Sequence, residues 1–286
     1  MTRILTIGAS AVVSIVLAFL IVTFTGVEDL FGPAPDRQIE VETPPERQPA
    51  RSAQAETPPP SQDLSPGPLA TTALTDAQTR VIDEVLSGSE LFQAIEQVFP
   101  AEFQTLRQEM EAAAPAGAAA IQSAAARGVA QLQSQNAPLL QTASSSALRN
   151  LVAENIRTHE VVQERAGDQV CAAFGLNGSA ALGPFANDDA IVAQLERQKA
   201  LLFRTMATGR GPTSRAPVND SDWASVIRFS ELSNENQNLV RIYGTQNAEN
   251  PRYCAAVLWF MNRLLDAEGE AADRARAAFA LQLAGS

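Results

Sequence analysis

The sequence predicts an all-α protein with a single N-terminal transmembrane helix, a disordered proline-rich spacer and one multi-helix globular domain. Three observations lead to this prediction. Residues 4–27 carry no charge, ten of the 17 prolines fall between Pro33 and Pro68, and apolar residues recur at helical spacing from residue 73 onwards. No later run alternates apolar and polar residues with the period of a half-buried strand, so we expect very little β-structure.

Residues 4–27 are expected to cross the membrane once, as an uncleaved signal-anchor helix. A helix over these 24 residues would be roughly 36 Å long at about 1.5 Å per residue, which is enough to span the hydrocarbon core. A cleaved secretory signal is the alternative, but its apolar region is usually about 7–15 residues long and ends at small residues. The run is longer here and no A-x-A-like site follows it, so the anchor is favoured.

The charges on either side of this run predict its orientation. Arg3 precedes it, Glu28 and Asp29 follow it, and positive charge tends to stay in the cytoplasm. We therefore expect residues 1–3 to form a short cytoplasmic tail. Lys199 is the only lysine among 21 basic residues, which is typical of a GC-rich genome. Together these features predict a single-pass protein of the bacterial inner membrane, with its N-terminus inside and its C-terminal domain in the periplasm.

Residues 28–72 are predicted to form a disordered linker. The segment combines proline with Glu, Gln, Ser, Asp and Arg, and has almost no large apolar residue between Val41 and Leu64. It cannot bury enough apolar surface to offset the entropy cost of ordering. Such a segment is typical of a tether that holds a domain away from a membrane. A ligand of an SH3-type domain is the alternative, but its partner would be cytoplasmic, which the predicted orientation disfavours.

Residues 73–286 are predicted to form a helical extracytoplasmic domain. Two loops are expected within it, at residues 175–184 and 209–219. Small residues, among them Gly128, recur on one helix face and predict close helix packing there. Capping residues, prolines and apolar spacing place the expected helix starts at or beside Thr75, Ser89, Pro100, Pro115, Asn136, Asn187, Asp220, Asn250 and Ala271. Residues 168–174 are expected to continue helical until Gly175.

Composition and motif spacing exclude several kinds of site. The net charge of −11 argues against nucleic-acid binding, which needs clustered Lys and Arg. One histidine and two cysteines exclude a Cys₄ zinc site and a paired ExxH di-metal site within one chain, and the separation of Cys171 from Cys254 excludes a CxxCH haem site. His159 has no second histidine four residues later, so the HExxH motif of metalloproteases is absent. The sequence therefore identifies no catalytic, cofactor-binding or metal-binding residue, and we expect no cofactor.

Cys171 and Cys254 are the only cysteines, and both lie in apolar helical segments. An isolated pair on an exported domain predicts a disulfide bond. Closing a loop of about 83 residues would stabilise the fold by roughly 4–5 kcal/mol on the chain-entropy account. The alternative is two separately buried thiols, because free cysteine packs as a small apolar residue.

Both tryptophans and both tyrosines fall between Trp223 and Trp259, in a window that also contains several arginines. Because Trp, Tyr and Arg are enriched at binding hot spots, this window is the predicted partner-binding region. Trp259 lies in an apolar run and is expected in the core. The alternative is that the aromatic residues all pack in the core, while the asparagines of the window cap helices and form turns. The candidate partner-binding residues are Arg228, Arg241, Tyr243 and Arg252.

This organisation predicts a membrane-anchored envelope protein whose outer helical domain is an interaction or scaffold module. Its partners would be the membrane, through residues 4–27, and another envelope protein or the cell wall. One alternative is an envelope enzyme that acts on the cell wall or a glycan through carboxylates assembled in the fold. A cleft with two carboxylates about 5–10 Å apart would favour the enzyme. A second alternative is a cleaved, soluble periplasmic protein.

Overall fold

The computed structural model describes residues 74–211 and 215–285. The expected cytoplasmic tail, transmembrane helix and linker, residues 1–72, lie outside these ranges. Within them the chain forms eleven α-helices and no strand, so the all-α prediction for the domain is confirmed. The helices are α2 (Asp76–Gly88), α3 (Glu90–Val98), α4 (Pro100–Ala113), α5 (Ala118–Asn136), α6 (Ser145–Ala166), α7 (Asp168–Asn177), α8 (Asp189–Thr208), α9 (Asp220–Ile227), α10 (Asn234–Thr245), α11 (Tyr253–Asp266) and α12 (Glu270–Gly285).

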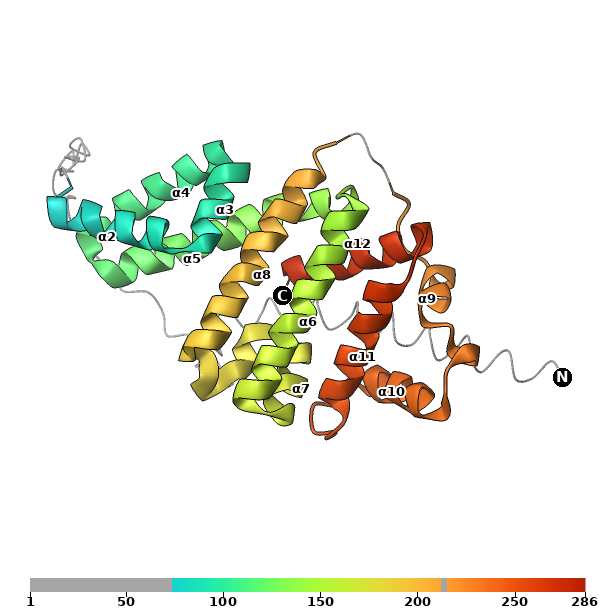
Figure 1. Ribbon diagram of the computed structural model, residues 1–286. Helices are drawn as coiled ribbons and strands as arrows, with labels where there is room; N and C mark the ends of the chain where they lie inside the picture. The colour runs from blue at the N-terminus through green and yellow to red at the C-terminus, as the bar shows by residue number, and fades with distance from the viewer. Residues whose placement is uncertain (1–73, 212–214, 286) are drawn as a thin grey trace, which may run out of the picture. The chain divides into compact units, whose positions relative to one another are not determined.

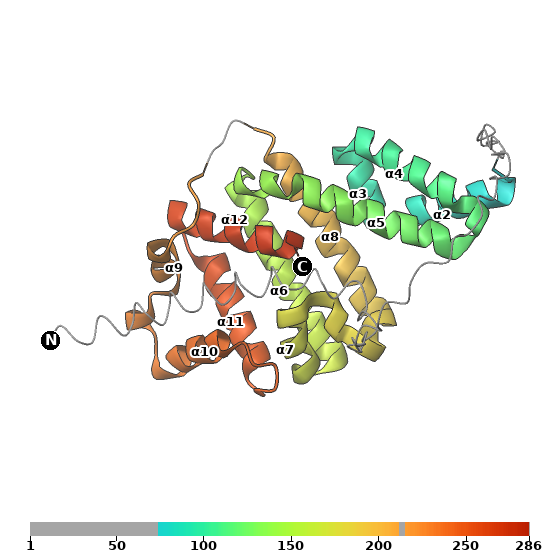
Figure 2. The ribbon, with the colours of Figure 1, turned by 180° about the vertical axis from the view of Figure 1, so that it is seen from behind.

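The helices are arranged around a central antiparallel pair, α6 and α8. Figures 1 and 2 show these two helices side by side, with α2 to α5 on one side of them and α9 to α11 on the other. Four 3₁₀ segments connect helices in the described ranges: η2 (Ala114–Ala116), η3 (Ala137–Gln141), η4 (Gly178–Asn187) and η5 (Phe229–Glu231). None of the described helices is both long enough and apolar enough to cross a membrane.

Several helix starts agree with the capping residues seen in the sequence. Thr75 forms a capping box with Gln78 at the start of α2. The Asp188 carboxylate accepts hydrogen bonds from two backbone N–H groups at the start of α8. Asn219 does the same at the start of α9, where Asp222 completes a capping box. These side chains satisfy backbone donors that would otherwise have no partner at a helix N-terminus.

Two predicted helix starts are wrong. Asn136 and Pro138 do not open the long helix: residues around Pro138 form η3, and α6 begins at Ser145. The Ser144 hydroxyl caps α6 instead, by accepting a hydrogen bond from the backbone N–H of Ala147. Pro115 lies in η2, and α5 begins only after Gly117, whose φ of 98° favours glycine. Proline fixes φ at a value that suits both α- and 3₁₀-helices, so its position alone did not decide which one forms.

The sequence reasoning also missed α10 and ended α7 too early. Ser233 caps α10, whose buried side chains are Leu239, Val240, Ile242 and Tyr243. The asparagine-rich first turn of this helix resembles a turn in composition, although the later apolar spacing is helical. Gly175, expected to begin a loop, lies inside α7, and the following residues form η4 rather than an irregular loop.

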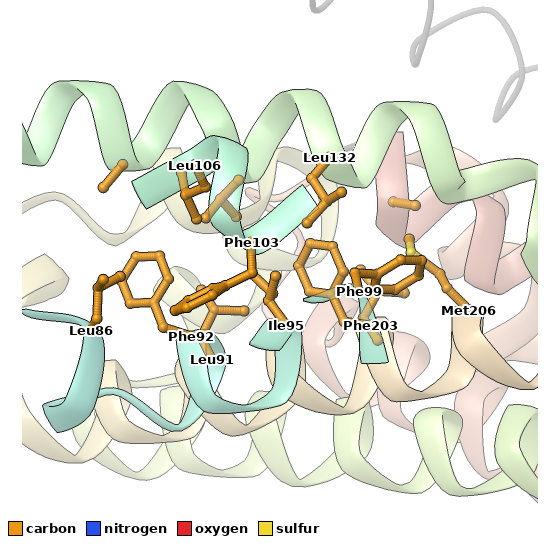
Figure 3. Close-up of a cluster of buried hydrophobic side chains, with 14 of the residues drawn as sticks. Leu86, Leu91, Phe92, Ile95, Phe99, Phe103, Leu106, Leu132, Phe203 and Met206 are labelled. Carbon is orange, nitrogen blue, oxygen red and sulfur yellow. The ribbon is translucent and has the colours of Figure 1, made fainter. Parts of the chain in front are cut away.

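One hydrophobic cluster joins α2 to α5 with α8 and the C-terminal part of α12. Figure 3 shows part of it, with Phe99 beside Phe203 and Met206 at one end. The rings of Phe99 and Phe203 meet edge to face, with centroids 6.1 Å apart. Gly128 brings α5 close to α4, because a Cβ there would lie only 2.3 Å from Leu106 Cδ1. The close packing predicted from small residues is therefore confirmed at this position.

A second cluster occupies the space between α6, α7 and α9 to α12. Its centre contains Tyr243 of α10 stacked on Phe260 of α11, with ring centroids 4.5 Å apart. At the C-terminus of α11, the buried guanidinium of Arg276 donates to the backbone oxygens of Leu264 and Leu265. It thereby satisfies carbonyl groups that have no partner within the helix. The turn from α11 into α12 is fixed by this contact.

Candidate functional site

Cys171 on α7 and Cys254 on α11 lie next to each other in the second cluster. Their Sγ atoms are 2.01 Å apart, at disulfide bonding distance, and their Cα atoms are 5.5 Å apart. Both side chains are buried. The two cysteines therefore meet as the sequence predicted, rather than lying in separate parts of the core, and they connect two helices that are distant in the sequence.

A cavity of about 160 Å³ lies where the two hydrophobic clusters meet. Helices α6, α7, α8, α11 and α12 all contribute side chains to its wall. Four aromatic rings, those of Phe174, Tyr243, Phe260 and Phe279, line it. The lining also includes exposed Ser179 and Lys199, which places its opening between η4 and α8.

His159, the only histidine, forms part of this wall. Its Nδ1 lies 3.0 Å from the backbone oxygen of Asn155, one turn earlier in α6. A carbonyl oxygen only accepts hydrogen bonds, so Nδ1 carries the hydrogen and Nε2 presents a lone pair. The pKa of the imidazole is lowered from 6.5 to about 4. Burial is the dominant cause, and the hydrogen bond to Asn155 opposes it by raising the pKa. The ring is therefore neutral at pH 7.

The Nε2 atom of His159 is buried and has no hydrogen-bond partner among the described residues. It faces α7 at Gly175, where a Cβ would lie 3.6 Å from it. The ring packs edge to face on Phe174, with centroids 4.9 Å apart. An unsatisfied buried acceptor costs about 1–3 kcal/mol, so this atom marks a position where a donor would be favourable.

Two amide side chains lie beside His159 in the cavity wall. The Gln198 amide on α8 donates to Asn155 Oδ1 on α6, at 2.6 Å. The Asn155 amide in turn lies 3.0 Å from the thioether sulfur of Met261 on α11, which is a weak acceptor. The cavity thus combines an aromatic wall with a small polar region formed by three helices.

A line of buried polar groups continues from the cavity along the contact between α6 and α8. The Gln194 amide donates to Glu154 Oε1 at 2.8 Å and also reaches the Thr158 hydroxyl. Glu154 accepts a further hydrogen bond from Arg157, at 3.0 Å. Because each of these groups has a partner, they fix the register of α6 against α8 and form no reactive centre.

The four candidate partner-binding residues do not gather on one surface. Arg228 and Arg241 are exposed. Arg228 pairs with Glu231 at 3.8 Å, and the Arg241 guanidinium lies 5.9 Å from the centroid of the Phe229 ring. Arg252 is exposed but paired with Glu235, at 3.1 Å. Tyr243 is only 6% exposed and belongs to the core and the cavity wall, which differs from the surface role expected for it.

Trp259, expected in the core, is half-buried and packs against the second cluster. Trp223 is also half-buried, and its ring is tilted against that of Phe260 at a centroid distance of 5.9 Å. The largest fully buried side chain in the described ranges is instead that of Tyr253, beside Cys254. Position in an apolar run therefore identified the buried helix but not which of its residues faces inwards.

Carboxylates are placed away from the cavity. None of the side chains that line it in the described part of the chain is Asp or Glu. The described residues also contain no cluster of three or more His, Cys, Asp or Glu side chains that could hold a metal ion. The buried Asp222 carboxylate pairs with Arg274 at 2.7 Å, joins α9 to α12 and is a structural contact.

Comparison with family models, with curated proteins and with solved structures finds no match to this chain. Sequence reasoning placed His159 at the core edge or in solvent, and did not single out Asn155 or Gln198. Asn155 and His159 are four residues apart and so share a helix face. That spacing was the available signal, but it does not show that the face borders a cavity.

Proposed function

We propose that this protein is a membrane-tethered interaction module of the bacterial envelope, in which residues 74–285 bind another envelope protein or the cell wall. The observation that carries the proposal is the buried pair Cys171 and Cys254, whose sulfurs lie at bonding distance. Disulfides persist in oxidising compartments and are rare in the cytosol. Together with the uncharged run at residues 4–27, the pair supports a domain held on the outer side of the inner membrane.

Two exposed arginines, Arg228 and Arg241, with the half-buried ring of Phe229 support an interaction role and are here called the Phe229 patch. The Arg241 guanidinium lies beside the ring, while Arg228 is in a long, exposed pair with Glu231 at 3.8 Å. Exposed arginines suit a partner with carboxylates, because arginine binds them through two parallel hydrogen bonds. The chain as a whole carries a net charge of −11, so a positively charged surface patch is distinct from its surroundings and can orient an acidic partner. Carboxylates of a peptide or of the cell wall meet this description.

The location is tested by reporters fused after Ser286. A reporter that is active only in the periplasm should give signal, while a reporter that is active only in the cytoplasm should not. The mass of the protein's N-terminus distinguishes the anchor from a cleaved, soluble form, because residues 4–27 remain in the anchored protein. Signal from the cytoplasmic reporter alone would contradict the proposed location.

The interaction role is tested by affinity capture from intact membranes, comparing wild type with the double variant Arg228→Ala and Arg241→Ala. If the Phe229 patch is the contact, the variant should recover its partner at least tenfold less efficiently, as expected for a hot spot of about 2 kcal/mol or more. Arg127→Ala is the matched control, since Arg127 is an exposed arginine on α5. Equal recovery by the double variant and the control would place the interface elsewhere.

A further inference from the structure

The cavity beside His159 has the size and lining of a small-molecule site. Its volume of about 160 Å³ is close to the roughly 150 Å³ of an engineered apolar core cavity that admits benzene. Aromatic rings from four helices surround it, and such rings favour a flat ring as occupant through edge-to-face and offset-stacked contacts. The volume limits that occupant to one ring or a small fused pair.

The polar groups of the wall specify what this ring should carry. His159 Nε2 is an acceptor that has no donor among the described residues, and its residue is only 5% exposed. The tautomer is fixed by the hydrogen bond from Nδ1 to the Asn155 backbone oxygen. A ligand atom that meets Nε2 must therefore donate a hydrogen bond, as a hydroxyl or an N–H group does.

The charges around the cavity exclude an ionised ligand. No Asp, Glu or Arg side chain lines the described wall, and the only charged lining residue is Lys199, which is exposed at the opening. A charged group placed between the aromatic rings, away from Lys199, would lose its hydration without gaining an opposite charge, which is strongly unfavourable. A neutral molecule avoids this cost.

We propose that this cavity binds a small neutral aromatic molecule with a hydroxyl or N–H group, such as a phenol or an indole, and that His159 Nε2 accepts the hydrogen bond from that group. A Cβ at Gly175 would lie 3.6 Å from Nε2, so the missing side chain leaves room beside that atom. The proposal is independent of the membrane location and of the Phe229 patch, because it uses none of the residues on which those two proposals rest.

The single histidine provides a direct test by NMR on the full-length chain labelled with ¹⁵N-histidine, since one pair of ring signals reports on one residue. Phenol should shift the Nε2 signal to saturation, in the direction of hydrogen-bond acceptance. Toluene, which has the same ring without the donor, should bind about three- to tenfold more weakly and leave that signal close to its original position. Benzoate should not bind.

Two variants separate the hydrogen bond from the fit of the ring. His159→Phe keeps an aromatic ring but removes the acceptor, so the preference for phenol over toluene should disappear. Gly175→Ala should block phenol binding, because the added Cβ would lie 3.6 Å from Nε2 and 3.1 Å from Val257 Cγ2. Gly88→Ala is the control, since a Cβ there meets nothing within 4 Å.

An Nε2 signal that does not respond to phenol or indole in the wild-type chain would overturn the proposal. Equal affinity of the wild-type chain for phenol and toluene would also overturn the proposal, and this comparison does not depend on the folding of any variant. Retention of the preference for phenol in a folded His159→Phe variant, checked by circular dichroism, would show that another group accepts the hydrogen bond.

Discussion

Nδ1 of His159 lies 3.0 Å from the backbone oxygen of Asn155, inside a protein interior that holds the imidazole neutral. Burial lowers the pKa of this ring from 6.5 to about 4. In the unfolded chain the imidazole takes up a proton near pH 6.5, whereas in the folded chain it does so only near pH 4. Between these values the unfolded state binds more protons, so the stability of the fold decreases as the pH falls.

The first prediction is therefore a loss of stability in mildly acidic solution. Between pH 6.5 and pH 5 the free energy of unfolding should fall by about 2 kcal/mol because of His159. Urea unfolding at pH 7, 6 and 5 measures this change. His159→Phe should lose much less stability over the same range, because the chain has no other histidine. The same pH dependence in wild type and variant would assign the effect to other groups.

The second prediction concerns the bond between Cys171 and Cys254. Peptide mapping without reduction should recover the two cysteine-containing peptides linked to each other. Replacing both residues with alanine should destabilise the fold by roughly 4–5 kcal/mol on the chain-entropy account, because the bond closes a loop of about 83 residues. Treatment of the wild type with a reductant should have a similar effect on the unfolding midpoint. Alkylation of both thiols in the unreduced protein would contradict the bond.

The third prediction compares two neighbouring aromatic residues on α11. Phe260 is 6% exposed and stacks on Tyr243, so Phe260→Ala should destabilise the domain by about 3–5 kcal/mol. Trp259 is half-buried, so Trp259→Ala should cost clearly less, although its side chain is larger. Thermal unfolding of both variants gives the comparison. A greater loss for Trp259→Ala would show that its half-buried ring makes the more important contacts.

The third prediction also shows what the sequence alone could determine. Helix content, the α2 and α8 caps and the meeting of the two cysteines follow from local signals: capping side chains, apolar periodicity and cysteine count. The orientation of α11 does not, because its apolar run covers almost the whole circumference of the helix, and only neighbouring helices decide whether Trp259 or Phe260 faces inwards.

The cavity lay beyond sequence reasoning for a related reason. Its wall combines residues from α6, α8 and α11, such as His159, Gln198 and Met261, which are separated by up to about a hundred residues in the chain. The local sequence around any one of these residues does not predict that the other two lie beside it. Likewise, the asparagine-rich start of α10 has the composition of a turn, and its helix is stabilised by packing of its second half in the core.

The last prediction tests a close backbone approach that only the folded structure reveals. Gly209 follows α8, where a Cβ would lie 1.9 Å from the backbone oxygen of Leu139 in η3. The contact is reinforced by the Thr142 hydroxyl, which donates to the Gly209 backbone oxygen at 2.7 Å. Backbone atoms cannot move aside as a flexible side chain can, so any residue other than glycine must push α8 and η3 apart.

Gly209→Ala should therefore destabilise the domain by at least about 1–3 kcal/mol, the usual cost of inserting a methyl group into a well-packed position. Gly211→Ala is the matched control, because the nearest atom to its Cβ, the Thr208 oxygen, would be 4.0 Å away. Urea unfolding of both variants at pH 7 should show a clear loss for Gly209→Ala and almost none for Gly211→Ala. If the two variants are equally stable, α8 and η3 are not held as closely as the structure shows, and the hydrogen bond from Thr142 would not constrain them.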